Sequence, residues 1–410
     1  MVPKGWSPSQ IGDIAKFYSG STPSKQRSEY WGGGEPWISG KDLKTHYLEN
    51  SIDTLTEVGF QVAKKAPEGS SLILVRGMTL LKDFPVGYAT REVAFNQDLK
   101  ALVPIESVNG LFLSFLLVAE KHKILQLVST AGHGTGRLDT NSIQGHPINL
   151  PPLPEQEKIA QILSTWDKTI TITEQLIASS QRQKKALMQQ LLTGKKRLVD
   201  KNGERFSGEW KDVEIGRVLK EVKRPVDWDD EAEYKLLSVK RRSEGVVLRE
   251  VLKGSDILTK KMNVAHSGDF LISKMQIVHG AAGLVSDEFD GFHVSDSYIS
   301  LIPKDESKLN IHFFAWFAKQ KLMYHKAFLC SYGVHIEKMT FNFKLFLKEK
   351  IRVPVSIEEQ QKIAAVLSSA DQEISALQQK LDALKQEKKA LMQQLLTGKR
   401  RVKIDDKEIA

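Results

Sequence analysis

One twelve-residue string, KKALMQQLLTGK, stands in this chain twice, at residues 184–195 and again at residues 388–399. The copies are 204 positions apart (388 − 184), and the same offset relates residues 155–156 to residues 359–360. A period this long exceeds the roughly 20–50 residues of a solenoid repeat. The chain is therefore predicted to be a duplicated unit, in which each copy is a globular segment followed by a long helix.

Composition limits the classes of protein that fit. The 410 residues give room for several domains with hydrophobic cores. The 59 Lys and Arg residues against 50 Asp and Glu residues give a formal charge of +9, which fits a polyanionic partner without requiring one. No stretch approaches the roughly 20 apolar residues of a membrane span. The start lacks an apolar leader and Cys330 is the only cysteine, so we expect a cytoplasmic protein without disulfides.

The first globular segment is predicted to mix strands with a helix. Short β-type runs bounded by Gly and Pro stand at residues 72–75 and 99–104, and a helical run covers residues 111–125. Loops rich in Gly, Ser and Thr, where recognition residues often lie, are expected at residues 19–25, 29–37 and 131–140.

The second globular segment is predicted to repeat this plan with different polar residues. Residues 270–276 correspond to the first strand, 294–303 to the second and 312–322 to the helix. In this alignment Lys274 takes the place of Arg76 at the end of a strand. The corresponding strands and helix, with different polar residues at the strand ends, predict that the two segments have the same fold but contact different partners.

The two helices carry the clearest local pattern. Apolar residues alternate at spacings of three and four over more than four heptads, which is typical of a coiled coil. A helix of about 39 residues is about 60 Å long. Ser356 with Glu359 predicts a capping box, Pro154 a first turn, and Gly194 and Gly398 helix ends. The stripe residues are Ile159, Leu163, Trp166, Ile170, Leu187 and Leu191 in the first helix and Ile363, Leu367, Ile374, Leu381, Leu391 and Leu395 in the second.

We expect the two helices to pair antiparallel; the alternative is two helices that each pack only on their own segment. Lys184 and Lys388 interrupt the stripes at equivalent places. Antiparallel pairing would bring Lys184 to Asp371 and Lys388 to Asp167 as a register device, although each lysine could instead extend its charge to solvent. The predicted fold class is α+β: two mixed α/β segments separated by two long antiparallel coiled-coil helices, with a pseudo-twofold internal repeat.

Motifs for catalysis are weak. The string GHGTG at residues 132–136 resembles a phosphate loop but lacks the Lys-Ser/Thr ending of a P-loop. Its amides are better suited to approach DNA, or it is a plain surface loop. Asp227 with Glu233 and Lys235 has the residue types of a metal nuclease, yet this spacing is common in charged turns. No His or Cys pairs have zinc-ligand spacing, so we predict no metal site and no catalysis in this chain.

Taken together, the motifs resemble those of a known family. Each globular segment is opened by a Trp and an Ile-Gly pair, as at Trp6 and Trp210, and each is closed by a Glu-Gln entry into a helix that ends LLTGK. This chain is similar to the specificity (S) subunit of type I restriction-modification enzymes, and the strings GSTPSK and YWGGGEPWISGKDL resemble one class of that family's target-recognition domain. The second segment lacks the TPSK and PW strings. The expected boundaries are residues 1–152 and 198–354 for the target-recognition domains, 153–197 for the central helix and 355–410 for the C-terminal helix and tail.

The resemblance implies a non-catalytic subunit that reads a bipartite, asymmetric DNA target. Each target-recognition domain would read one half, and the helices would fix the unread gap. The helices would also bind two methyltransferase (M) subunits, which two restriction (R) subunits would join. AdoMet would then belong to the M subunits, and ATP and magnesium to the R subunits.

DNA contacts are expected from polar residues on the loops and strand ends of both domains. Lys and Arg would bind phosphates, and Arg76 and Arg137 could grip guanine with two hydrogen bonds. For each candidate, a purely solvated surface role is the alternative. The candidates are Ser21, Thr22, Lys25, Lys41, Arg76, Lys82, His133, Thr135 and Arg137 in the first domain and Lys240, Arg241, Arg242, Lys274, Gln276, His279, Tyr332, His335 and Lys338 in the second.

Three other functions fit parts of the sequence. A two-headed DNA-binding regulator would explain the charge and the repeat, but it would not need tails identical beyond a coiled-coil pattern. A coiled-coil scaffold without a DNA role would explain the helices alone. The recognition part of another split methylation defence system has the same sequence features as the main interpretation.

Overall fold

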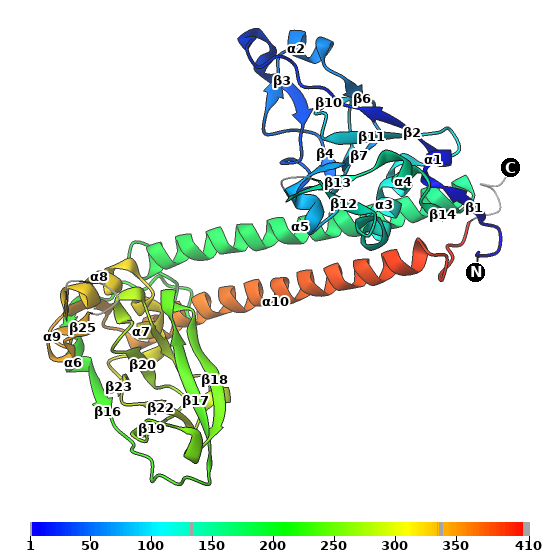
Figure 1. The fold of residues 1–410 in the computed structure, drawn as a ribbon. Helices are drawn as coiled ribbons and strands as arrows, with labels where there is room; N and C mark the ends of the chain where they lie inside the picture. The colour runs from blue at the N-terminus through cyan, green and yellow to red at the C-terminus, as the bar shows by residue number, and fades with distance from the viewer. Residues whose placement is uncertain (1, 132–133, 334, 336–338, 405–410) are drawn as a thin grey trace. The chain divides into compact units, whose positions relative to one another are not determined.

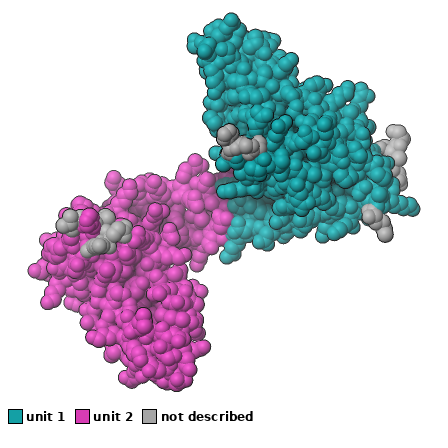
Figure 2. All heavy atoms as spheres, in the orientation of Figure 1, with its two compact units in different colours: residues 1–174, 379–410 teal, residues 175–378 magenta. Residues whose placement is uncertain are grey.

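The computed structural model of the chain describes residues 2–131, 134–333, 335 and 339–404. It divides into two compact units, coloured separately in Figure 2: unit 1 is Met1–Glu174 with Gln379–Ala410, and unit 2 is Gln175–Gln378. The division cuts both long helices, α5 (Leu153–Leu191) and α10 (Ile357–Leu395). Each unit therefore contains one globular segment, part of the helix that follows it and part of the other helix.

Unit 1 holds globular segment 1, residues 2–152, which is drawn from blue to cyan in Figure 1. Its helices are α1 (Ile11–Ile14), α2 (Glu57–Val62), α3 (Gly110–Leu125) and α4 (Thr140–Gln144), with short 3-10 turns at Ser28–Tyr30 and Met78–Leu81. Its strands are β1 (Ser7–Gln10), β2 (Ala15–Ser19), β3 (Trp31–Ile38), β4 (Tyr47–Leu48), β5 (Thr54–Leu55), β6 (Lys65–Ala66), β7 (Ser71–Leu74), β8 (Arg76–Gly77), β9 (Val86–Ala89), β10 (Val93–Phe95), β11 (Leu99–Pro104), β12 (Val128–Ala131), β13 (Thr135–Leu138) and β14 (Pro147–Leu150).

A five-stranded sheet in the order β2-β11-β7-β9-β4 supports the main core of unit 1. The apolar helix α3 packs against β7, β9 and β11, and its residues Phe112 and Leu113 are fully buried. Leu395 and Leu396 from the end of α10 join the same core. A second sheet, β5-β3-β10-β6, has its own small core around Trp37. The beginning of α5 and the end of α10 are thus part of this unit's interior.

Unit 2 holds globular segment 2, residues 198–354. Its helices are α6 (Ile215–Val218), α7 (Ile311–Ala318), α8 (Lys321–Leu329) and α9 (Phe343–Phe346), with 3-10 turns at Arg241–Ser243, Gly254–Asp256, Ile277–His279 and Asp287–Phe289. Its strands are β15 (Trp210–Glu214), β16 (Leu219–Val222), β17 (Glu233–Lys240), β18 (Gly245–Lys253), β19 (Met262–Ala265), β20 (Phe270–Ser273), β21 (Ala282–Leu284), β22 (Phe292–Ser295), β23 (Tyr298–Pro303), β24 (Ser331–Tyr332), β25 (Thr340–Phe341) and β26 (Lys350–Pro354).

The topology of unit 2 repeats that of unit 1. The pair β15-β26 matches β1-β14, and the sheet β16-β23-β20-β21 matches β2-β11-β7-β9. In both units a parallel pair, β3-β10 or β17-β22, lies in the second sheet. The predicted α+β class and the internal repeat are confirmed.

Within each unit the two helices lie side by side and antiparallel (Figure 1). In unit 1, Glu155, Asp167 and Glu174 of α5 bind Arg401, Lys388 and Lys385, in that reversed order. In unit 2, Lys184 and Arg197 bind Asp371 and Glu359. The predicted antiparallel pairing and both predicted ion pairs are confirmed, and the alternative of two unpaired helices is wrong. Most stripe residues are buried or half-buried, and Leu163, Leu191 and Leu367 are fully buried.

The helix ends follow the predicted signals with one correction. Gly194 and Gly398 adopt left-handed φ angles of +70° and +68°, as a helix C′ residue does. Ser356 Oγ accepts a hydrogen bond from the backbone N–H of Glu359 at 3.3 Å. The carboxylate of Glu359, however, does not complete a capping box, because both of its oxygens accept hydrogen bonds from Arg197.

Three predicted elements of the globular segments differ from the structure. Residues 312–322 were expected as one helix, but α7 ends at Ala318 and α8 begins at Lys321, because Gln320 is extended with ψ 147°. Residues 29–37 were expected as a loop, but residues 29–30 belong to the 3-10 turn Ser28–Tyr30 and the rest to strand β3, which has a bulge. Residues 131–140 were also expected as a loop, but Thr135–Leu138 form strand β13, which pairs with both β12 and β8.

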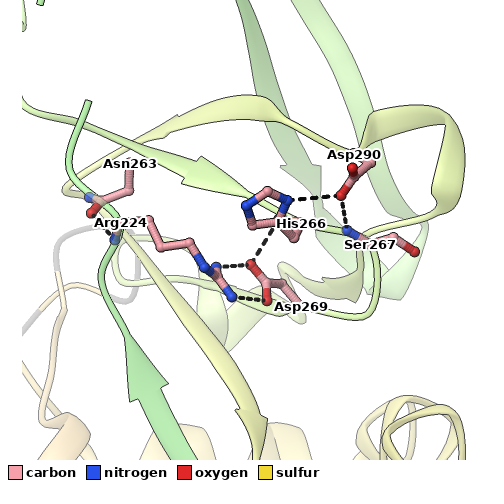
Figure 3. A network of polar contacts seen from close by, with 6 residues as sticks. All are labelled: Arg224, Asn263, His266, Ser267, Asp269 and Asp290. Atoms are coloured by element: carbon pink, nitrogen blue, oxygen red, sulfur yellow. Dashed lines mark hydrogen bonds and ion pairs between the residues drawn. The ribbon is translucent and has the colours of Figure 1, made fainter. Parts of the chain in front are cut away.

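A polar network ties the linker after β16 to the second sheet of unit 2 (Figure 3). Arg224 donates two hydrogen bonds to the buried carboxylate of Asp269, at 2.6 and 3.1 Å. Asp269 also accepts from the backbone of His266, and the imidazole of His266 lies 3.0 Å from Asp290. Hydrogen bonds from the Ser267 amide and His266 lower the pKa of the Asp290 carboxyl. The network is structural, since its charges satisfy one another.

Across the residues that the structure describes, no helix is long and apolar enough to cross a membrane.

Candidate nucleic-acid interface

Globular segment 1 carries a small basic notch, named notch 1, where β7, β8, β11 and β13 meet. Its volume is about 210 Å³. Strand β8 begins just after the buried strand β7, so Arg76 is exposed at the rim of this notch. The lining residues are Val75, Arg76, Gln97, Lys100, Arg137, Leu138, Asp139 and Thr140.

Arg76 and Arg137 are direct partners across the antiparallel pair β8-β13. Both side chains are exposed, and in the described part of the chain neither is in an ion pair. By contrast Arg91, Arg197, Arg224 and Arg401 each bind a carboxylate. Asp139, on the same rim, uses its carboxylate to cap α4. Two adjacent guanidinium groups without an internal partner can bind phosphate oxygens or a guanine edge.

The loop at residues 19–25 is fixed against the strand end beside notch 1. Its Gly20 lies so close to β10 that a methyl group there would come within 2.2 Å of the Asn96 carbonyl oxygen. Ser21 donates its N–H to Phe95 at 2.9 Å and its Oγ accepts from the amide of Lys64. Thr22 donates to Gln97, a residue of the notch. Ser21 therefore anchors the loop to its neighbours, and Thr22 bonds to the side chain of Gln97.

The remaining candidates of segment 1 do not line notch 1. Lys25, Lys41 and Lys82 are exposed, and Lys41 lies 3.7 Å from Asp53 in a surface ion pair. Thr135 is half-buried at the start of β13. His133 lies outside the described residues. Their role in DNA binding stays a prediction.

Globular segment 2 has a notch at the corresponding place, named notch 2, between the ends of β16, β20 and β23 and the hairpin β24-β25. Its volume is about 440 Å³. Its lining combines three lysines with the exposed ring of Tyr332, where notch 1 has guanidinium groups. The lining residues are Glu221, Lys223, Lys274, Ile299, Tyr332, Thr340, Phe341, Asn342, Phe343 and Lys344.

The correspondence between Lys274 and Arg76 is off by one residue. The amide of Lys274 bonds to Ser297 as the amide of Val75 bonds to Asp98, both at 2.9 Å. Met275 therefore occupies the place of Arg76. Lys274 still reaches notch 2, where its Nζ donates to the carbonyl of Asp296 at 2.5 Å.

Lys240, Arg241 and Arg242 lie together at the tip of the long hairpin β17-β18, and all three are exposed. Arg242 and Ser243 have φ angles of +59° and +56°, a conformation that costs a non-glycine residue about 1–2 kcal/mol. The turn is held because Ser243 donates its N–H to Gly280 at 2.9 Å. The hydroxyl of Ser243 also bonds to that of Tyr324 at 2.5 Å. The fold thus enforces a strained turn that presents basic side chains.

Of the other candidates in segment 2, Gln276 and His279 are half-buried beside this turn, and His335 is exposed. Lys338 lies outside the described residues. Sequence reasoning missed Gln97, Lys100 and Asp139 in notch 1 and Lys223, Asn342 and Lys344 in notch 2. Lys100 was detectable, since it is the one charged residue within the β-type run of residues 99–104. The others belong to the notches only through strand pairing.

No group of three or more His, Cys, Asp or Glu side chains is placed to hold a metal ion in the ranges of the chain that the structure describes.

Comparisons with known proteins identify relatives of this arrangement. The chain is 33% identical over 170 residues to the EcoR124I/EcoR124II specificity subunit of Escherichia coli, covering 40% of this chain and 42% of that protein. It is 25% identical over 423 residues to the MjaVIII specificity subunit of Methanocaldococcus jannaschii, covering 98% and 94%. Two further relatives, the MjaIX and HindI specificity subunits, also match over 39% and 37% of their own lengths. The chain thus spans about two fifths of the length of the EcoR124I/EcoR124II and MjaIX subunits.

A solved structure shares the fold. The S subunit of a type I restriction-modification system from M. genitalium superposes with a TM-score of 0.60 at 14% identity, over 97% of this chain and 99% of that one. The family model described as "Type I restriction modification DNA specificity domain" matches this chain twice, at residues 3–179 and 208–386. These matches cover most of the chain, which therefore belongs to the family of type I restriction-modification specificity proteins.

Proposed function

We propose that this chain is the DNA sequence-recognition subunit of a type I restriction-modification complex and that it reads a bipartite, asymmetric target. The observation that carries this proposal is the pair of notches. They lie at the same place on a repeated frame, and their linings differ: guanidinium groups in notch 1, lysines and a tyrosine ring in notch 2. Equivalent sites with different chemistry fit two half-sites of different sequence.

Contacts with DNA phosphates and contacts with base edges would have separate effects on binding. Lysines such as Lys100 and Lys344 would bind phosphates and make affinity depend on salt. Arg76 and Arg137 would contact base edges, where a bidentate guanidinium contributes about 1–3 kcal/mol of discrimination. Notch 1 is therefore expected to read a guanine-containing half-site.

The exposed surface of the helix tails fits a partner that binds twice. Internal packing accounts for the identical Leu191-Leu192 and Leu395-Leu396, which are buried in the cores of unit 2 and unit 1. It does not account for exposed residues that are identical in both copies. These are Lys185, Gln189, Gln190 and Lys195 with their counterparts Lys389, Gln393, Gln394 and Lys399. We propose that they contact two M subunits, one at each copy.

A groove in unit 1 offers a surface for one M subunit. It lies between the beginning of α5 and the end of α10, has a volume of about 820 Å³ and is lined by apolar residues with basic residues around them. Trp166, Ile162 and Leu391 are only partly buried there. The R subunits would join through the M subunits. AdoMet would be held by the M subunits and ATP with magnesium by the R subunits, so this chain would have no catalytic role.

The test is co-expression of this chain with its candidate M subunit in bacteria without DNA methylation, followed by mapping of N6-methyladenine. One split motif with a fixed gap is the expected result. Random methylation, or none despite a stable complex, would refute the proposal. Replacing the residues of notch 1 by alanine should alter one half of the motif only.

A two-headed DNA-binding regulator is the second candidate, because it would also use both notches. It predicts DNA binding by the chain alone and no complex with an M subunit. A scaffold without a DNA role predicts neither sequence-specific DNA protection nor a motif. Copurification with the M subunit and footprinting therefore separate the three functions.

A further inference from the structure

Each unit contains a cluster in which an ion pair between α5 and α10 meets an aromatic ring of the globular segment. In unit 1, Lys388 donates to Asp167 at 2.5 Å, and its Nζ lies 5.1 Å from the ring centre of Phe115 on α3. In unit 2, Lys184 is paired with Asp371, and its Nζ lies 5.9 Å from the ring centre of Trp316 on α7.

The two clusters are equivalent positions of the repeat. Asn109 caps α3 and Asn310 caps α7; the side chain of each asparagine accepts a hydrogen bond from the backbone N–H of the third residue of its helix. Phe115 and Trp316 each follow their capping asparagine by six residues. The aromatic contact is therefore a feature of the duplicated unit and does not depend on the divergent loops.

Globular segment 1 binds the ion pair directly. Tyr47 donates its hydroxyl to Asp167 Oδ2 at 3.2 Å, so one carboxylate joins the segment, α5 and α10. The imidazole of His46 stacks on Phe115 with ring centres 5.0 Å apart. Burial is the main cause that lowers the pKa of His46 to about 4, and it also raises the pKa of Tyr47, to which Asp167 adds. This cluster is closely packed.

Globular segment 2 makes the equivalent contact with different groups. Lys319, in the break between α7 and α8, lies 3.9 Å from Asp371, and Trp316 donates its indole N–H to Ser368 on α10 at 3.0 Å. Two lysines therefore share one carboxylate. Burial is the main cause that lowers the pKa of Lys319. The charge of Asp371 partly opposes this shift, and the charge of Lys184 adds to it.

A pure register device for the helices would not need these contacts with the segments. Unit 1 provides the comparison: Lys385 and Glu174 form another pair between α10 and α5, at 2.7 Å. Both side chains are about half exposed, and in the described chain neither bonds to globular segment 1. The Lys388–Asp167 cluster differs because it joins a segment to the helices.

We propose that the two clusters are joints that hold each globular segment at a fixed angle on its helix pair, and that they determine which gap between half-sites the protein accepts. This inference rests on the proposed function. Adding one base pair to the gap moves a half-site by about 3.4 Å and turns it by about 35° around the DNA axis. The ends of the helices stay in the cores of both segments whether or not the joint is intact. A segment that is also held at its joint resists that displacement, whereas a segment with a weakened joint can turn further about the helix ends in its core.

The test uses the complete complex with the M subunits and DNA duplexes that carry both half-sites with the native gap or with one base pair more or fewer. The readout is the ratio of methylation rates, native gap over altered gap. Tyr47→Phe removes only the hydrogen bond to Asp167 and is expected to lower the ratio about threefold; Asp167→Asn is expected to lower it about tenfold. Both variants should keep the half-site bases. Glu174→Gln, which breaks the comparison pair, should leave the ratio unchanged.

The outcomes separate the two proposals. A wild-type complex without a split motif overturns the proposed function. A wild-type complex with a clear gap preference that Tyr47→Phe and Asp167→Asn leave intact overturns the joint. Equal losses in Glu174→Gln and Asp167→Asn also overturn it, because helix register alone would then explain the effect. If Asp167→Asn does not fold, Tyr47→Phe decides, since it keeps the ring.

Discussion

Arg401, just beyond α10, donates two hydrogen bonds to the carboxylate of Glu155 at the beginning of α5, at 2.6 and 2.7 Å. The same contact recurs 204 positions away between Arg197 and Glu359. Both carboxylates are fully buried. The fold thus needs the Glu-Gln entry of each helix and the arginine after the LLTGK string of the other. Part of the identity between the two tails therefore has an internal cause.

Removal of one arginine tests this account. Arg401→Ala would leave the buried carboxylate of Glu155 without its charge partner, although Trp6 still donates to it at 3.0 Å. We expect a loss of about 3 kcal/mol in the free energy of unfolding, measured by urea denaturation. Arg217→Ala, which breaks an exposed pair with Glu214, is the control and should cost less than about 1 kcal/mol. Equal small losses in both variants would contradict the buried contact.

Arg76 is expected to set specificity through geometry rather than charge. Arg76→Lys keeps the charge but loses the planar fork that binds two base acceptors. We expect discrimination against the wrong base in the half-site of notch 1 to fall by about 1–3 kcal/mol, with an unchanged salt dependence of binding. Fluorescence anisotropy with single-substitution duplexes at several salt concentrations measures both.

The control for this prediction is Arg91→Lys, because Arg91 is already paired with Glu35 at 2.6 Å. Arg91→Lys should change neither the discrimination against the wrong base nor the salt dependence of binding. If Arg76→Lys weakened binding to every duplex equally, Arg76 would be a phosphate contact instead.

The sequence predicted the fold well where the pattern is periodic or repeated. Strand β11 has the predicted bounds, the helix stripes are buried or half-buried, and the lysine interruptions at Lys184 and Lys388 led to both ion pairs. It failed where tertiary contacts decide. Residues 31–38 are rich in glycine, which is typical of loops, but they become a strand because β5 and β10 pair with them. Notch residues such as Lys223 and Lys344 come together only through sheet pairing, which a local pattern does not reveal.

His46 makes the stability of unit 1 depend on pH. Burial is the main cause that lowers its pKa to about 4; Lys388 adds to this shift, whereas Asp167 and the backbone contact with Val86 oppose it. Between about pH 6.5 and pH 4, the unfolded chain binds a proton that the folded chain does not. The free energy of unfolding therefore falls as the pH falls through this range, by up to about 1.4 kcal/mol per unit.

His46→Gln removes this term. At pH 7 the variant should be less stable than the wild type, because it loses the stacking on Phe115. At pH 5 the difference should be smaller by about 1–2 kcal/mol, since only the wild type has the cost of a neutral, buried histidine. Urea denaturation at the two pH values measures this; a difference that is constant with pH would show that His46 does not titrate as described.

Arg242 offers a case in which stability and function should change in opposite directions. Its φ of +59° is strained for arginine but not for glycine. Arg242→Gly should raise the free energy of unfolding by up to about 1 kcal/mol, because relief of strain exceeds the added freedom of the unfolded chain. If the hairpin tip contacts DNA phosphates, the same variant should weaken DNA binding and lower the salt slope by about one. Arg249→Gly on strand β18, paired with Glu250, is the comparison and should lower stability without this loss of slope. An Arg242→Gly variant that binds DNA as the wild type does would show that Arg242 makes no DNA contact.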